Sequence, residues 1–159
     1  MRSLQAALLY PGVAMLEAAT NWSVGRGTPA PFEQAGADWV KGAELAAYLN
    51  RRFVAGVRFY PTRFVPESSN RQGKTVEGVR FLVTDRESFS PARLGLEIAA
   101  ALQKLYPGKI DLEANARLIG SRDVIRALRD GTDPQTIEEQ WKPRLDEFIA
   151  RRKAYLLYE

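Results

Sequence analysis

Apolar residues recur at helical spacing most clearly in residues 90–105. There, leucine or isoleucine returns every three or four positions from Leu94 to Leu105, which places these side chains on one face of a helix. A Ser-Pro pair precedes the repeat and a Pro-Gly pair follows it, and these pairs are typical of a helix start and a helix stop. The pattern predicts that this segment is the main core helix.

The same spacing predicts further helices elsewhere in the chain. We expect Pro11 and Gly12 to end the first of them. We expect Pro143 to kink or split the last, because proline lacks the backbone N–H that a helix interior needs. These further helices are predicted at residues 3–10 with Ser3 as the cap, at 41–52, at 121–131 with Ser121 as the cap, and from residue 134 onward, after Thr132 and Asp133.

Strand patterns lie mainly in the first half of the chain. Residues 56–64 and 75–84 are rich in β-branched and aromatic side chains, and we expect them to pair antiparallel across the polar loop 66–74. Shorter apolar runs predict strands at residues 13–18 and 32–37.

The order of these elements indicates the fold class. Strands come early and helices late, which favours an α+β fold with a small mixed or antiparallel sheet packed by four to five helices. The 159 residues fit a single domain that spans 1–159. The apolar tail 155–158 is expected to need a surface on which to pack.

Composition narrows the chemistry that the chain can perform. The sequence contains no cysteine and no histidine, which excludes a disulfide framework, a Ser-His-Asp triad, a Cys-His protease and a histidine-bound zinc site. We therefore expect no metal and no cofactor. Carboxylate chemistry, or binding without chemistry, is what remains.

Charge and hydropathy give weaker indications about partners and membrane association. The net charge is +4, but the basic residues are scattered or lie at predicted helix ends, where they complement the helix dipole. We therefore expect no nucleic-acid partner. No apolar run reaches transmembrane length, and the first ten residues lack the pattern of a signal peptide.

The stretch that we place at the centre of the chain's function is residues 17–33, which we interpret as a polar recognition loop between two strands. Glycines flank Arg26, whose guanidinium suits carboxylates. Trp22 either stacks on a ligand or anchors the loop by packing. The alternatives for Arg26 are a solvated side chain or a salt bridge that fixes the loop. The substrate-binding candidates are Asn21, Ser23, Gly25, Arg26, Gly27 and Thr28.

Three carboxylates are candidates for catalysis. Glu17 and Glu33 lie at the two ends of this stretch, and Asp85 follows a predicted strand. The alternative is that each is a hydrogen-bonded or exposed carboxylate, so the sequence leaves the catalytic residues unknown.

Several motifs together resemble one family, the exo-β-N-acetylmuramidases, long catalogued as domain of unknown function 1343. The chain departs from the family pattern at Ala18-Ala19, where many members have one glycine, and at Val24, where glutamate is frequent. The motifs are YPG at 10–12, LE at 16–17, TNWSVGRGT at 20–28, PFE at 31–33, GADW at 36–39, GVRFYPTRF at 56–64, EGVRFLVTDR at 77–86, LGLEIAAALQKLYP at 94–107 and YLLY at 155–158.

The resemblance implies a function that composition does not show. Family members are two-domain glycosidases that release terminal N-acetylmuramic acid from peptidoglycan fragments, with an active cleft between the domains. This chain resembles their C-terminal half, without the Rossmann-like N-terminal half. The implied partners are that N-terminal domain and a muramic-acid glycan, on whose sugar Trp22 is a candidate to stack. The implied location is the cell envelope, periplasmic or secreted.

By this interpretation the chain contributes substrate-binding residues and is inactive alone. Glycoside hydrolysis normally uses two carboxyl groups, and the main catalytic carboxylate is then expected in the companion half. The alternative is a non-catalytic module that binds an anionic glycan or a protein partner.

Overall fold

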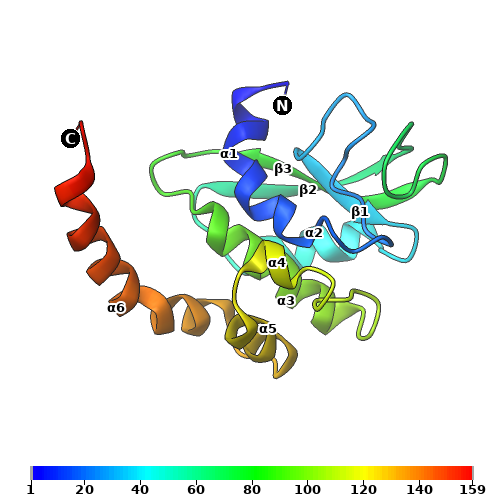
Figure 1. Ribbon diagram of the computed structural model, residues 1–159. Coiled ribbons are helices and arrows are strands. Elements are labelled where there is room, and N and C mark those ends of the chain that lie inside the picture. Colours follow the sequence, from blue (N-terminus) through cyan, green and yellow to red (C-terminus); the bar gives the residue numbers. More distant parts are fainter. Residues whose placement is uncertain (1, 159) are drawn as a thin grey trace.

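The computed structural model describes residues 2–158 and confirms an α+β fold in that part of the chain (Figure 1). Three strands form one antiparallel sheet in the order β1-β3-β2. The elements are α1 (Leu4–Val13), η1 (Ala14–Leu16), β1 (Gln34–Ala37), α2 (Gly42–Arg51), β2 (Val57–Phe64), β3 (Val76–Val83), α3 (Pro91–Leu105), α4 (Ala116–Ile119), α5 (Arg122–Arg129), α6 (Pro134–Arg152) and η2 (Lys153–Tyr155), where η1 and η2 are 3₁₀ helices.

Side-chain amides cover the sheet where strands lack a neighbour. On the outer edge of β2, Asn50 donates to the Phe59 carbonyl at 2.8 Å and accepts from the Phe59 N–H at 3.2 Å. On β3, the Gln5 amide contacts the backbone of Phe81 and Val83 beyond the end of β1. These amides tie α2 and α1 to the sheet and satisfy strand groups that would otherwise be unpaired.

The first helix continues past the point where the sequence predicted its end. Ser3 caps it, as expected, but the helix runs through Pro11 to Val13, so the predicted stop at Pro11-Gly12 was wrong. A Cβ at Gly12 would lie 2.1 Å from the Pro91 carbonyl oxygen. The close crossing of α1 and α3 at this glycine holds the helix on the core, and such packing outweighs local propensity.

Residues 13–18 do not form the predicted strand. Val13 completes α1, residues 14–16 form η1 and residues 17–18 form a turn. Val13 and Leu16 are almost fully buried. A short apolar run fits a buried helix as well as a strand. The polar stretch 17–33 therefore follows a 3₁₀ helix and precedes β1, instead of joining two strands.

Helix α6 leaves the body of the molecule. Asp133 caps its start, and Ile137 is buried in the core. The prediction for Pro143 was a kink or a split. The helix is continuous through Pro143 and is not split, and Figure 1 shows that it bends before its outer half rises away from the body. None of the helices in residues 2–158 is both long and apolar enough to cross a membrane.

Candidate functional site

Two loops pack on each other at the end of the sheet, and we call residues 17–33 and 65–75 the paired loops. The Glu67 N–H donates to the Gly27 carbonyl at 2.8 Å. The Asn70 amide donates to the carbonyls of Glu17 at 3.0 Å and Ala19 at 3.3 Å. The sequence did not predict this contact, because the second loop has little apolar content to indicate a packing surface.

Glycine is required at two positions of the first loop. Gly25 and Gly27 have φ of 76° and 74°, a region that strains residues with a Cβ. At Gly27 a Cβ would lie 2.5 Å from the backbone of Ser68 in the other loop. The two glycines thus set both the turn and the close approach of the loops.

The polar side chains of the first loop are used mainly to fix its shape. Thr28 Oγ1 donates to the Gly25 carbonyl at 2.7 Å and accepts from the Ala30 N–H at 3.1 Å. Ser23 Oγ accepts from the Gly25 N–H at 3.2 Å, and Asn21 donates to the Lys109 carbonyl at 2.6 Å. Ser23 and Thr28 are buried, so their hydroxyls stabilise the loop from within.

Trp22 anchors the loop to the core. Its side chain is fully buried, and its ring lies 6.1 Å from that of Trp39, which in turn contacts Tyr106. The packing alternative for Trp22 is therefore the one that the structure supports. A ring in this position holds the loop and is not available to stack on a ligand.

Arg26 lies at the surface of the loop. Its Nε and Nη2 donate to the two carboxylate oxygens of Glu17, and its guanidinium carbon lies 4.7 Å from the centre of the Phe32 ring. The Tyr10 ring contacts Phe32 edge-on at 4.8 Å. We call Tyr10, Glu17, Arg26 and Phe32 the Arg26 cluster.

The ion pair orients Arg26 without burying it. Hydrogen bonding to Glu17 raises the pKa of Arg26, so the guanidinium stays charged. Its side chain remains 46% exposed. The salt-bridge alternative for Arg26 thus describes its contacts, while the exposed edge remains accessible to a ligand.

The cluster unites four short motifs from residues 10–33. YPG supplies Tyr10, LE supplies Glu17, GRG supplies Arg26 and PFE supplies Phe32. Phe32 has φ of 65°, and such a conformation in a bulky residue is strained and typical of functional sites. Sequence reasoning did not identify Tyr10 and Phe32 as site residues, although the motifs that contain them were the available signal.

Glu33 is held by a separate set of donors. Its carboxylate accepts from Ser3 at 2.5 Å, from Gln5 at 3.1 Å and from Arg80 at 2.9 Å. The residue is buried. Glu33 therefore ties the start of α1 to the sheet, and its oxygens are already occupied.

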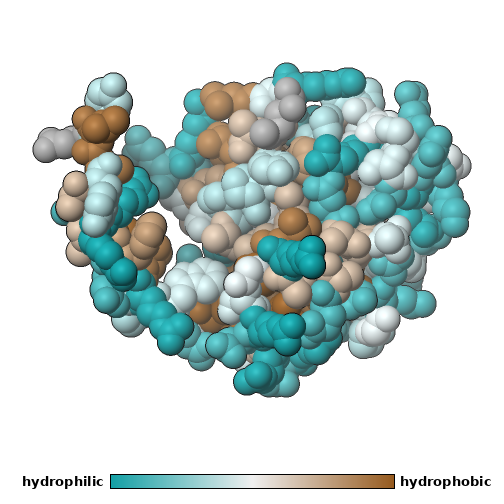
Figure 2. Space-filling view, viewed as in Figure 1, coloured by the Kyte–Doolittle hydropathy of each residue, from teal (hydrophilic) through white to brown (hydrophobic). Residues whose placement is uncertain are grey.

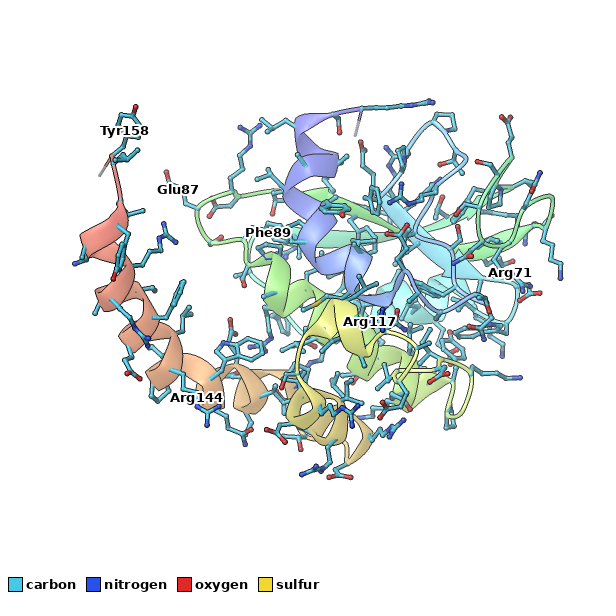
Figure 3. The ribbon with its side chains drawn as sticks, viewed as in Figure 1. Arg71, Glu87, Phe89, Arg117, Arg144 and Tyr158 are labelled. Carbon is cyan, nitrogen blue, oxygen red and sulfur yellow. The ribbon has the colours of Figure 1, made fainter. Side chains whose placement is uncertain are left out.

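Asp85 lies in the connection between β3 and α3, away from the paired loops. Figure 3 shows Glu87, from the same connection, on the side of the body that faces α6, whereas Arg71 of the second loop lies on the opposite side. Hydrogen bonds from the Ser88 hydroxyl at 2.6 Å and the Glu87 N–H at 3.0 Å lower the pKa of Asp85. The structure therefore does not bring Asp85 together with Glu17 and Arg26.

Hollows of the surface lie beside α6. One of about 510 Å³ is bordered by Arg52, Phe53 and Glu138, and one of about 390 Å³ by Trp141 and Leu145. Among the described residues, no group of three or more His, Cys, Asp or Glu side chains is placed to hold a metal ion.

Comparisons with known proteins agree on one family. The model of the family described as "Exo-beta-N-acetylmuramidase NamZ, C-terminal" matches residues 8–158. The chain is 33% identical to "Peptidoglycan beta-N-acetylmuramidase NamZ" of Bacillus subtilis (strain 168) over 161 aligned residues, which cover 99% of this chain and 39% of the relative.

A solved structure agrees with the sequence comparison. A DUF1343 family protein from Bacteroides fragilis NCTC 9343 matches with a TM-score of 0.85 and 25% identity, over 96% of this chain and 42% of that one. The chain thus spans about two fifths of the length of these two proteins.

Proposed function

We propose a function from one premise: the chain belongs to the family of the C-terminal domain of exo-β-N-acetylmuramidase NamZ. The proposal is that it is the C-terminal domain of a peptidoglycan exo-β-N-acetylmuramidase. In that enzyme the Arg26 cluster forms one wall of a cleft, and a companion domain, matching the rest of the longer relatives, forms the other wall. Glycan binding at this cluster is part of the proposal.

The observation that carries the proposal is the oriented, half-exposed guanidinium of Arg26. Glu17 engages Nε and Nη2, and within residues 2–158 this leaves Nη1 for a ligand. N-acetylmuramic acid carries a lactyl carboxylate, and arginine binds carboxylates through strong charge-assisted hydrogen bonds. Gly25, Gly27, Ser23, Thr28 and Asn21 fix the loop that presents Arg26.

Proton transfer is assigned to the companion domain. A glycosidase needs one carboxyl group that is protonated to protonate the leaving oxygen. Glu17 is paired with a cation, Glu33 accepts three hydrogen bonds, and Asp85 has a pKa below its usual value. These environments favour a supporting role for all three: Glu17 orients Arg26, Glu33 braces α1, and Asp85 shapes its turn.

The test is hydrolysis of a chromogenic β-N-acetylmuraminide by the complete two-domain protein. We expect Arg26→Ala to lower kcat/KM by about 10- to 100-fold, the loss of one charged hydrogen bond. Arg129→Ala is the matched control, because Arg129 forms a similarly exposed ion pair with Glu113 elsewhere. The corresponding N-acetylglucosaminide lacks the lactyl carboxylate. We therefore expect Arg26→Ala to leave the rate of its hydrolysis unchanged.

Equal turnover of the muraminide by wild type and Arg26→Ala would remove Arg26 from the site. A second measurement addresses the alternative of a non-catalytic binding module. Titration of the chain alone with a muramic-acid disaccharide is expected to give no saturable binding if the companion domain completes the cleft. Saturable binding by the chain alone would favour the module.

A further inference from the structure

The outer part of α6 and the residues after it form an extension that we call the arm, residues 143–158. A single apolar stripe runs along the helix at positions three or four apart. It begins in the core with Ile137, which is 2% exposed, and continues through Trp141 to Leu145 and Phe148, which are 46% and 53% exposed. The stripe that packs α6 on the body therefore continues where the body ends.

The last residues of the arm are still more exposed. Tyr155, Leu157 and Tyr158 are 80%, 90% and 87% exposed. Figure 2 shows brown apolar surface at the tip of the arm, separated from the rest of the molecule. A contiguous exposed apolar surface of this kind typically marks an interaction site.

The base of α6 is fixed to the body, in contrast to its outer half. Glu97 is buried and accepts from Arg52 at 2.8 Å and from Arg93 at 2.9 Å. Arg52 also contacts Asp133 at 2.6 Å, and Arg93 contacts Glu138 at 3.1 Å. A buried carboxylate shared by two arginines holds its partners firmly. The arm is thus an outward extension of a well-anchored helix.

The comparison structure indicates that the arm belongs to the family fold. The match to the Bacteroides fragilis protein covers 96% of this chain, so most of the arm falls within it, and that protein has more than twice the matched length. A shared extension of this kind, in a longer chain, has additional protein available to cover it.

The positions of three chain segments also indicate that this additional protein covers the arm. In Figure 1 the N-terminal end of α1, the tip of the arm and the first of the paired loops all lie along the upper side of the molecule. In a longer relative whose C-terminal part matches this chain, the preceding domain joins at that end of α1. One body placed there can reach both the Arg26 cluster and the arm.

We infer that the arm is the docking element for the companion domain, an inference that rests on the proposed function for the presence of that domain. The companion presents an apolar groove that receives Phe148, Leu157 and Tyr158. Acidic side chains border this groove, because the arm also carries the exposed cations Arg151, Arg152 and Lys153, of which Arg151 is also paired with Glu147. The arm therefore holds the companion over the Arg26 cluster.

The experiment measures binding between two separate polypeptides by calorimetry. One is this chain; the other is the segment of the same genome that matches the remainder of the Bacillus subtilis relative. We expect the double variant Phe148→Ser/Leu157→Ser to bind at least about 10-fold more weakly, because exposed aromatic and leucine anchors carry much of an interface's energy. Phe53→Ser is the control, since Phe53 is 81% exposed and lies off the arm.

Three results would overturn the inference. These are wild-type affinity in the double variant, no binding by the wild-type chain, and a self-associated chain that the double variant turns into a monomer without any effect of the companion. Light scattering on the chain alone detects the last case. Circular dichroism checks that the variants fold, which exposed positions should permit.

Arg26→Ala separates this inference from the proposed function. We expect that variant to bind the companion with unchanged affinity, because Arg26 lies outside the arm. A loss of docking in the arm variant with normal docking in Arg26→Ala supports the inference whatever the activity measurement shows. Loss of activity in Arg26→Ala, together with docking that does not depend on the arm, would support the proposed function and overturn the inference about the arm.

Discussion

The paired loops and the arm differ in how far their side chains find partners within this chain, and the difference is the reverse of what their composition suggests. The loops are polar, yet their hydroxyls and amides are largely satisfied by the chain itself, and their tryptophan is fully buried. The arm has an apolar stripe, yet Phe148 and Leu157 are exposed. A polar segment can therefore satisfy its hydrogen bonds within its own chain, while a segment with an apolar stripe still needs a partner to bury it.

The difference teaches where each region's stability comes from. The loops depend on contacts between distant parts of this chain, such as Asn70 with the backbone of Glu17. The outer arm depends on helix propensity, since few tertiary contacts reach it. Substitutions of buried or contact-forming residues in the loops should therefore destabilise the domain, and substitutions in the arm should leave its stability nearly unchanged.

The largest effect is expected at Trp22. Trp22→Ala should lower the free energy of unfolding by about 3–5 kcal/mol, because it removes a fully buried indole and leaves a cavity. Phe148→Ser on the arm should change it by less than about 0.5 kcal/mol. Urea denaturation followed by circular dichroism measures both, and similar losses for the two variants would break the comparison.

A smaller effect is expected where the two loops touch. Gly27→Ala should cost about 1–3 kcal/mol, because it adds strain at positive φ and a clash with Ser68. Gly73→Ala is the control: its φ is 70°, but a Cβ there would meet no atom within 4 Å. Equal losses in urea denaturation would mean that backbone conformation alone, and not the loop contact, makes glycine necessary.

The smallest effect concerns the base of α6 and depends on pH. Burial acts to raise the pKa of Asp133, but hydrogen bonds from the Gln135 N–H and Arg52 outweigh it, and the pKa is lowered. The stability that the carboxylate contributes is therefore present above its unfolded pKa of about 3.9 and is lost as the pH falls through its folded pKa.

Asp133→Asn is the variant that measures this contribution, because asparagine also caps a helix. We expect it to lower stability at pH 7 by about 0–1 kcal/mol, since Asp133 is 45% exposed and such pairs are screened. The difference from wild type should narrow toward pH 2. Asp123→Asn, at an 86% exposed position, serves as the control, and a constant difference at all pH values would contradict the assignment.

The local pattern of the sequence was sufficient to predict much of the fold. The helix starts at Ser3, Ser90 and Asp133 stand where the sequence placed them, and the antiparallel pair β2–β3 follows from two alternating segments. It was not sufficient at Pro11 or in residues 13–18, where packing against α3 decided the conformation. For the site, the sequence indicated Arg26 and the glycines beside it, but not the aromatic rings that surround the guanidinium.

The sequence by itself determined the fold class, the absence of histidine and cysteine chemistry, and the family, because these depend on residue types and on local periodicity. Only the tertiary structure decided that Tyr10, Glu17, Arg26 and Phe32 meet, that Ser23 and Thr28 face inward, and that the arm leaves the body. The physical reason is that burial and side-chain partners depend on contacts that form only when the chain folds, within one stretch as well as between distant segments, and a linear pattern does not specify which of two compatible surfaces a segment will meet.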